Sequence, residues 1–155
     1  MKHDIYFLRL AKLVSERSKD PSTKTGAVLV APTGEVISTG FNGFPRGMPD
    51  LPEHYANREE KYSRIIHCEM NALIFARRDL TGATLYTWPF MSCDRCAVHM
   101  LQAGIRRFVA PVSDNPRWQD AFARVRKYLA ECQAELVEVE LSALPSDLAA
   151  PLLAA

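Results

Sequence analysis

The sequence has no long apolar run and no marked excess of charge of either sign. No segment approaches the roughly 18 consecutive apolar residues that a membrane-spanning helix needs. No apolar core of a signal peptide follows Met1 to Asp4. The 19 basic residues nearly balance the 18 acidic ones, which leaves a net charge of +1 and argues against a dedicated nucleic-acid surface. With 48% hydrophobic residues, the composition predicts a soluble, cytoplasmic globular protein without membrane or nucleic-acid partners.

Cysteine is also scarce, with four in 155 residues, and a chain of this length can bury a sizeable core without disulfides. Cys93 and Cys96 form a C-x-x-C pair, which is typical of a metal site with reduced thiols. Cys132 is expected to be a small core residue. The length and the lack of repeats predict one domain over residues 1–155. Residues 142–155 form a Pro- and Ala-rich tail, whose leucines are expected to dock on a neighbouring subunit.

The candidate metal-binding and catalytic residues lie in two short motifs, His67-x-Glu69 and Cys93-x-x-Cys96. Zinc favours thiolate and imidazole ligands, and a catalytic zinc site takes three ligands from the protein and leaves the fourth position to water. His67, Cys93 and Cys96 supply three such ligands. Glu69 lies two residues from a ligand, where a carboxylate can take the proton of that water and pass it to a leaving group. The motifs therefore predict a catalytic zinc site with Glu69 as proton shuttle.

Each motif also opens an apolar, helix-like segment. The apolar residues between 70 and 75 predict a buried helix that begins at His67. A second helix is predicted from Cys93 to Gly104, with Cys96 one turn along the same face. A helix N-terminus lowers the pKa of a thiol and favours the thiolate that zinc requires.

The same cysteines allow a second interpretation, a closed structural zinc site. His99 or Cys68 would then supply the fourth ligand. That interpretation leaves Glu69 unexplained.

The paired motifs resemble those of the zinc-dependent nucleoside and nucleobase deaminases, whose signature is H-x-E followed by P-C-x-x-C. Between about residues 18 and 109, the resemblance is to deoxycytidylate (dCMP) deaminases. It is carried by Asp20–Lys24, Gly40–Gly47, His67–Ala72 and Gln102–Ile105. Two residues depart from the pattern: Ser92 stands in place of the proline, and Cys68 stands where the family usually has alanine. Serine still caps a helix well, so the zinc interpretation holds.

The resemblance implies a hydrolase that converts dCMP to dUMP and releases ammonia. In such a reaction a zinc-bound hydroxide attacks C4, and Glu69 carries protons to N3 and to the leaving amine. It also implies a homo-oligomer with dCTP or dTTP as effector. Cytidine, cytosine, guanine or a tRNA adenosine stay open as substrates, and so does a non-catalytic zinc module.

Five further residues are candidates for substrate binding, and each also has an ordinary structural interpretation. The resemblance implies that Asn42 contacts the substrate, although an asparagine here can simply begin a turn. Lys24 and Arg46 are candidates for the phosphate, with hydroxyl groups of residues 22 and 23 beside them, but solvated loop charges are common. Ala27 can leave room for the base or be a plain strand residue, and Ser92 precedes a zinc ligand.

The order of elements predicts an α/β fold with a mixed five-stranded sheet. Strands are expected at 26–31, 35–40, 83–87, 106–111 and 134–141, and helices at 4–18, 53–66, 67–75, 93–103 and 117–131. On the first helix, Phe7, Leu10, Ala11 and Val14 form the apolar stripe, which Tyr6 and Leu13 widen. The long connection 42–66 is expected to act as a lid or effector loop. The resemblance supplies the rest, a three-layer α/β/α cytidine-deaminase-like architecture.

Overall fold

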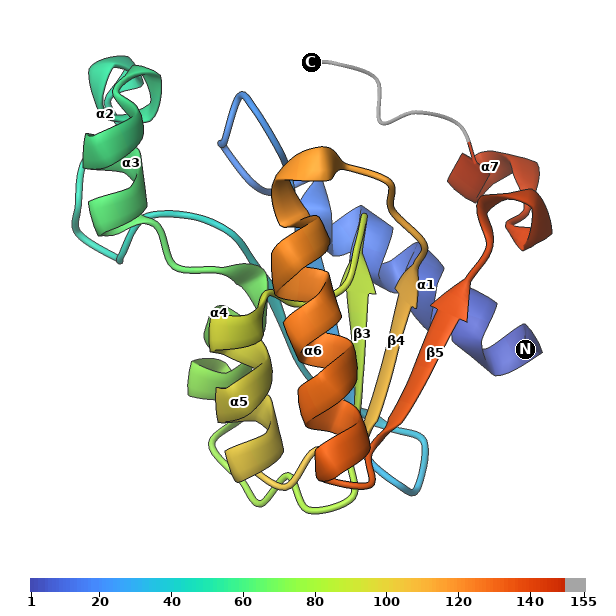
Figure 1. Cartoon of the computed structure of the whole chain (residues 1–155). Helices are drawn as coiled ribbons and strands as arrows, with labels where there is room; N and C mark the ends of the chain where they lie inside the picture. The colour runs from blue at the N-terminus through green and yellow to red at the C-terminus, as the bar shows by residue number, and fades with distance from the viewer. Residues whose placement is uncertain (150–155) are drawn as a thin grey trace.

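A computed structural model describes residues 1–149 and shows a mixed five-stranded sheet with helices on both faces (Figure 1). The strands are β1 (Gly26–Val30), β2 (Val36–Phe41), β3 (Thr84–Trp88), β4 (Arg107–Pro111) and β5 (Glu135–Val139). The helices are α1 (Lys2–Ser15), α2 (Pro52–Ala56), α3 (Arg58–Arg64), α4 (Cys68–Ala76), α5 (Asp94–Gln102), α6 (Gln119–Glu131) and α7 (Ser146–Ala149), with 3-10 turns η1 (Pro116–Trp118) and η2 (Leu141–Ala143). The predicted fold class is confirmed, and the expected helix 53–66 is two short helices, α2 and α3. No helix within residues 1–149 combines the length and the apolar character needed to cross a membrane.

The strand order β2-β1-β3-β4-β5 brings several chain segments to one edge of the sheet. β1 is antiparallel to β2 and β3, while β3, β4 and β5 are parallel. Gly26 at the start of β1 pairs with Phe41 and with Trp88, the last residues of β2 and β3. The segments that precede β1 and follow β2, β3 and β4 therefore meet at this edge, the usual place for a ligand site in an α/β sheet.

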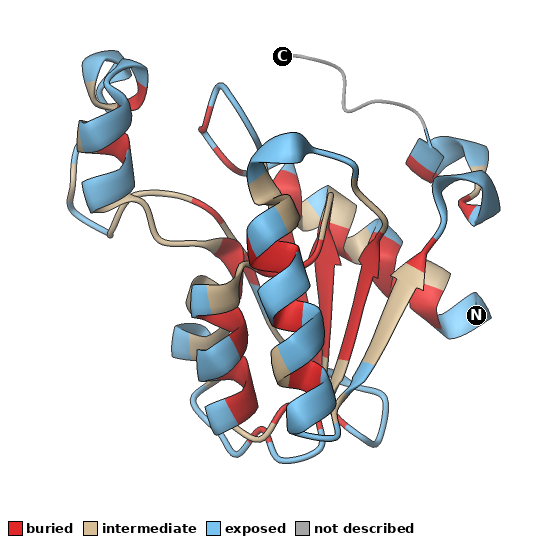
Figure 2. Ribbon diagram, in the orientation of Figure 1, coloured by how far each residue is buried: buried red, intermediate tan, exposed pale blue. Residues whose placement is uncertain are grey.

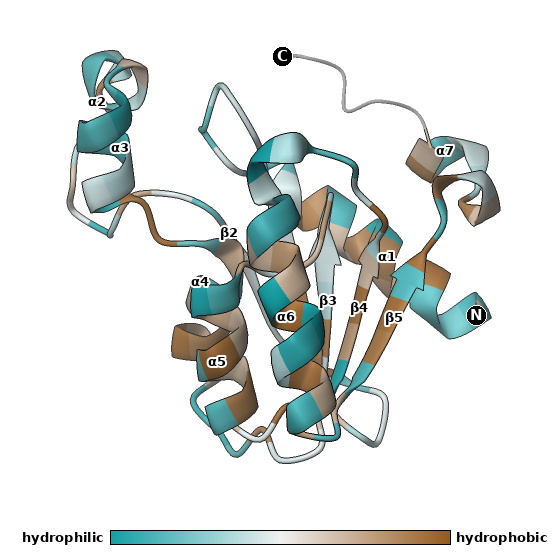
Figure 3. Ribbon diagram, viewed as in Figure 1, coloured by the Kyte–Doolittle hydropathy of each residue, from teal (hydrophilic) through white to brown (hydrophobic). Residues whose placement is uncertain are grey.

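Successive side chains of a strand pack alternately in two cores, one on each face of the sheet. Ala27 and Leu29 of β1 lie in the core formed with α4, α5 and α6. Val28 and Val30 lie in the core formed with α1. Figure 2 shows β3 and β4 buried between these two layers, and Figure 3 shows apolar residues in β4 and β5. Because two faces are covered, the central strands read as nearly continuous apolar runs.

The stripe predicted on α1 is confirmed, because Phe7 and Ala11 are buried and Leu10 and Val14 pack against the same core, but its widening by Tyr6 and Leu13 is wrong. Tyr6 and Leu13 are 61% and 60% exposed, whereas Leu8 and Ser15 are fully buried. The reason is the close approach of α1 to β1, since a Cβ atom on Gly26 would lie 2.7 Å from the backbone nitrogen of Ser15. This contact requires small side chains at Ala11 and Ser15, and counting apolar residues alone could not show the burial of Ser15.

Two expectations about buried side chains are wrong. Cys132 is exposed, because it lies just beyond the end of α6. Leu144 and Leu148 of the tail pack into the core of their own chain beside α1, so they are not available to a neighbouring subunit. The other two tail leucines, Leu152 and Leu153, lie outside the described residues.

The packing of α4 on β2 depends on a glycine. A Cβ atom on Gly40 would lie 2.2 Å from the carbonyl oxygen of Cys68 and 2.4 Å from the backbone nitrogen of Ala72. Asn71 Nδ2 donates a hydrogen bond of 2.7 Å to the carbonyl oxygen of Phe41, which fixes the helix to the end of the strand. The first turn of α4 is thereby held against the sheet edge described above.

Replacing Gly40 with alanine should force α4 away from β2 and destabilise the protein by roughly 2 kcal/mol or more. The measurement is thermal unfolding together with zinc content. Gly43→Ala is the matched control, because the nearest atom to a Cβ there is 3.9 Å away. Equal unfolding temperatures for the two variants would contradict this account of the α4–β2 contact.

Candidate zinc active site

A cavity of about 450 Å³ opens at the edge of the sheet where β1 begins and β2, β3 and β4 end. Its lining comes from all of these segments and includes Thr25 before β1, Asn42 after β2, Met91 after β3 and Asn115 after β4. Further lining residues come from α2, α3 and the first turn of α4. The topology of the sheet brings these segments to one edge.

His67, Cys93 and Cys96 lie together, as predicted, and His67 and Cys93 line this cavity. His67 is the N-cap residue of α4, and Cys93 is the N-cap residue of α5. One ligand atom from each of the three lies within 4.8 Å of the others. His67 Nδ1 is 3.5 Å from Cys93 Sγ and 3.4 Å from Cys96 Sγ. An imidazole nitrogen and two sulfurs converging at this spacing fit the donor set of zinc.

Without a metal ion, the three side chains share protons as one hydrogen-bonded cluster. Hydrogen bonds from the Cys96 side chain and from His67 lower the pKa of Cys93 to about 4. The backbone N–H of Cys96 also donates to Cys93 Sγ at 3.4 Å, as the free N–H groups of a helix N-terminus do. The pKa of Cys96 is raised because its thiol donates to the Cys93 thiolate, and contact with Cys93 raises the pKa of His67. A metal ion that binds here displaces the protons shared within this cluster.

Glu69 lies in the first turn of α4, is 5% exposed and lines the same cavity. Its Oε2 accepts a hydrogen bond of 3.2 Å from Cys68 Sγ. Burial raises the pKa of the Cys68 thiol well above its usual range, so the sulfur keeps its proton. Neither Cys68 nor His99 belongs to the donor cluster among residues 1–149, and the exposed His99 faces the carbonyl oxygen of Arg95.

Asn42 lines the cavity, whereas Ala27 and Ser92 are buried and are not among the described residues that line it. The Asn42 side chain is buried, accepting from the backbone N–H of Thr25 at 2.8 Å and donating to the carbonyl oxygen of Thr23 at 2.9 Å. These bonds hold the loop before β1 in place, and contact of Asn42 with a substrate stays a prediction. Ala27 is fully buried in the core. Ser92 is 2% exposed, and its Oγ has no hydrogen-bond partner among the described residues.

Lys24 and Arg46, the cations predicted to bind phosphate, are not among the described residues that line the cavity. The Arg46 guanidinium lies over the ring of Phe75, 5.2 Å from its centroid, on the outer side of α4. Their role toward a phosphate stays a prediction.

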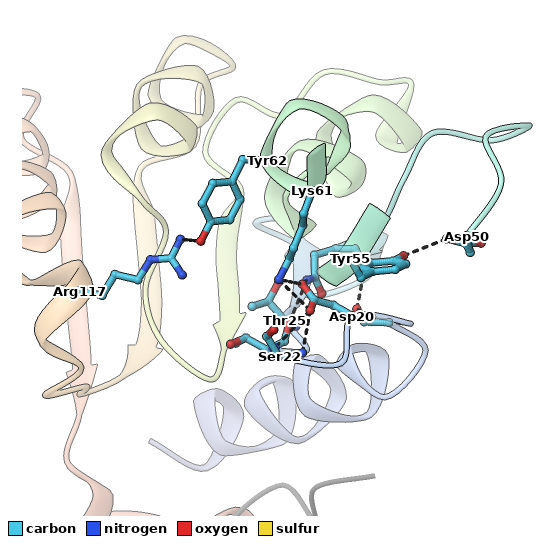
Figure 4. Close-up of polar contacts among 11 residues, drawn as sticks. Asp20, Ser22, Thr25, Asp50, Tyr55, Lys61, Tyr62 and Arg117 are labelled. Carbon is cyan, nitrogen blue, oxygen red and sulfur yellow. Dashed lines mark hydrogen bonds and ion pairs between the residues drawn. The ribbon is translucent and has the colours of Figure 1, made fainter. Parts of the chain in front are cut away.

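The cations that do line the cavity are Arg58, Lys61 and Arg117, and sequence reasoning missed all three. Lys61 of α3 is buried against Asp20, with 2.7 Å between Nζ and Oδ2 (Figure 4). Asp20 Oδ1 also accepts from the backbone N–H of Ser22 at 2.8 Å. This ion pair anchors α3 to the loop before β1. Its partners are 41 residues apart, so no local sequence pattern could have indicated it.

On the other side of the cavity, α3 contacts the segment after β4. Arg117 donates to the hydroxyl of Tyr62 (Figure 4). Its guanidinium lies 4.9 Å from the Tyr62 ring centroid and 4.8 Å from that of Trp118. Phe90 and Phe122, 5.8 Å apart between centroids, continue this aromatic wall. The connection 42–66 thus supplies a wall of the site, and its action as a lid or effector loop stays a prediction.

Comparisons with known proteins agree with this geometry. A family model described as "Cytidine and deoxycytidylate deaminase zinc-binding region" matches residues 1–111. An Aliivibrio fischeri protein described as "Uncharacterized deaminase in luxG 3'region" is 41% identical over 105 residues, which cover 68% of this chain and 69% of that protein. The deoxycytidylate deaminase of Mus musculus is 34% identical over 110 residues, which cover 67% of this chain and 61% of the mouse protein. A probable deoxycytidylate deaminase of Caenorhabditis elegans is matched over 53% of its length.

Among solved structures, the dCMP deaminase of cyanophage S-TIM5 has the same fold. Its apo form superposes with a TM-score of 0.70 at 20% identity, covering 89% of this chain and 98% of the phage chain. Its complex with dCMP and dUMP superposes with a TM-score of 0.69 at 23% identity, covering 86% and 94%. The chain therefore belongs to the cytidine and deoxycytidylate deaminase family, and His67, Cys93 and Cys96 are positioned to hold its zinc ion.

Proposed function

We propose that this protein hydrolyses the C4–N bond of a cytosine nucleotide, converting dCMP to dUMP and ammonia. The observation that carries the proposal is the cluster of His67, Cys93 and Cys96 at a cavity of about 450 Å³ that the Glu69 carboxylate also lines. The names of the relatives support dCMP as substrate, and so does the phage enzyme whose structure holds dCMP and dUMP.

The base would occupy the part of the cavity that lies between the zinc site and the aromatic wall. Phe90, Met91 and Trp118 line this part and offer flat or apolar surfaces to a pyrimidine ring. Such surfaces bind the ring by stacking and exclude bulk water from it. Stacking does not determine which ring atom reacts, so the distance from the metal ligands would select C4.

His67, Cys93 and Cys96 would hold the zinc ion, which would supply Lewis acidity and lower the pKa of a water molecule toward neutrality. Glu69 accepts the proton from that water and passes it to N3 of the ring. It then takes the second proton of the water and gives it to the amine that leaves from C4. One C–O bond forms and one C–N bond breaks, so cytosine and water yield uracil and ammonia, and Glu69 ends as it began.

The phosphate would bind at the end of the cavity formed by α3 and η1. Arg58 and Arg117 line this end, and the exposed Ser22 and Thr23 add hydroxyl donors. Lys61 also lines it, but its charge is already matched by Asp20. Arginine suits phosphate because its planar guanidinium donates two parallel hydrogen bonds. Lys24 and Arg46 are the competing candidates.

Three further proposals rest on the resemblance and on composition. The protein would form a homo-oligomer, it would respond to dCTP or dTTP as effector, and it would work in the cytoplasm. Light scattering, and rates measured with and without each nucleotide, test the first two.

Cys93→Ala or Cys96→Ala should lose zinc and much of the stability, because metal binding is coupled to folding. Glu69→Ala should keep zinc and the fold while losing nearly all turnover, because it removes the proton carrier and no ligand. Metal analysis, thermal unfolding and ammonia release on each purified variant check this. A zinc-free Glu69→Ala protein would refute the role assigned to Glu69.

Ammonia release should be fastest with dCMP in a panel that also holds deoxycytidine, cytidine, cytosine, dCTP and guanine. Two charge-assisted hydrogen bonds to phosphate contribute roughly 1.5–3 kcal/mol each, so kcat/KM for dCMP should exceed that for deoxycytidine about a hundredfold or more. Remote binding energy also positions the reacting carbon, so kcat should fall with the nucleoside. Equal kcat/KM values for the two would remove the nucleotide assignment.

The same comparison locates the phosphate. Arg58→Ala and Arg117→Ala should each reduce the preference for dCMP over deoxycytidine about tenfold or more. Arg95→Ala, on the exposed side of α5, is the matched control and should leave the preference unchanged. Loss of the preference in Lys24→Ala or Arg46→Ala instead would move the phosphate site to those residues.

A further inference from the structure

The carboxylate of Glu69 is held by the residue that precedes it. Cys68 Sγ lies 3.2 Å from Glu69 Oε2, and both side chains are buried, at 2% and 5% exposure. Among residues 1–149, this is the side-chain hydrogen bond that the Glu69 carboxylate accepts. Successive side chains of a helix normally point apart, so this contact requires a particular side-chain conformation at Glu69. Glutamate has three rotatable side-chain bonds, and the thiol restricts them.

The donor itself is fixed in place. The carbonyl oxygen of Cys68 lies against Gly40, where even a Cβ atom would be only 2.2 Å away. Ser38 Oγ donates a hydrogen bond of 2.6 Å to the carbonyl oxygen of Ala72, one turn further along α4. The first turn of α4 therefore packs closely on β2, and this packing fixes the position of the backbone that holds the Cys68 side chain.

The contact also gives the two carboxylate oxygens of Glu69 different roles. Oε2 is engaged by the thiol, whereas a proton carrier needs one oxygen that can reach both the water and the ring. Both Cys68 and Glu69 line the cavity, so the thiol is beside the reacting groups without being among the metal ligands. Alanine, which the resembling deaminases usually carry at this position, has no donor and cannot make this contact.

We propose that Cys68 is a positioning residue, whose S–H group holds Glu69 Oε2 and so aims the free oxygen of the carboxylate at the substrate. The role in turnover rests on the proposed function. The contact between the two side chains does not.

Infrared spectroscopy of the zinc-loaded protein tests the contact without any substrate. The chain has four cysteines, and the two zinc ligands carry no S–H when metal is bound. In a Cys132→Ala background, Cys68 is therefore the one remaining S–H oscillator. Adding Glu69→Ala should shift its S–H stretching band to higher frequency, because the acceptor is lost. Asp94→Asn, which removes a carboxylate next to Cys93, is the matched control and should leave the band in place. An unshifted band in the Glu69→Ala protein would overturn the proposal.

Kinetics test the consequence. A thiol is a weak donor, so Cys68→Ala should lower kcat about three- to tenfold, with KM and zinc content unchanged. Cys68→Ser restores a donor and should recover most of kcat. If Cys68 had a purely structural role, the two variants would differ in unfolding temperature but not in kcat. Equal kcat values for Cys68→Ala and Cys68→Ser would therefore overturn the positioning role. If the wild type fails to deaminate dCMP, the proposed function fails, while the infrared result still decides the contact.

Discussion

The close packing of α4 on β2 is the constraint on which the site depends. At Gly40 the backbone of the helix comes within a distance that no side chain could occupy, and Asn71 ties the helix to the last residue of the strand. His67, Cys68 and Glu69 all belong to this first turn. The cysteines arrive separately, on the helix that follows β3. The zinc site therefore exists because two helix N-termini are brought to one edge of one sheet.

The polar groups around the cavity are held by the same kind of cross-chain contact. Lys61 and Asp20 form a buried ion pair, and breaking such a pair by removing one partner typically costs about 3–5 kcal/mol. Asp20 and Asn42 together fix the loop before β1, whose hydroxyl groups face the cavity. On the opposite side the Arg117 guanidinium contacts two aromatic rings, those of Tyr62 and Trp118. The walls of the cavity thus come from segments far apart in sequence, and the metal site supplies its reactive end.

The zinc ligands could be predicted from sequence because their chemistry is local. Two thiols three residues apart at the start of a helix face one way, and few residue types can replace them. The cations of the cavity could not be predicted in this way. Nothing in the sequence distinguishes Lys24 from Arg58 as a candidate to bind phosphate. Only the position of α3 over the loop before β1 shows that Arg58 lines the site. The burial of Ser15 on α1 was missed for a related reason, since Gly26 and Ser15 meet through tertiary packing that no periodicity contains.

The central claim is that the zinc site keeps one coordination position for the reaction. X-ray absorption at the zinc edge of the purified protein tests this most directly. The account predicts two sulfur ligands at about 2.3 Å, one imidazole nitrogen at about 2.0–2.1 Å, and one further light-atom ligand from solvent. A third sulfur, from Cys68, or a second imidazole, from His99, would show a closed structural site and would contradict it.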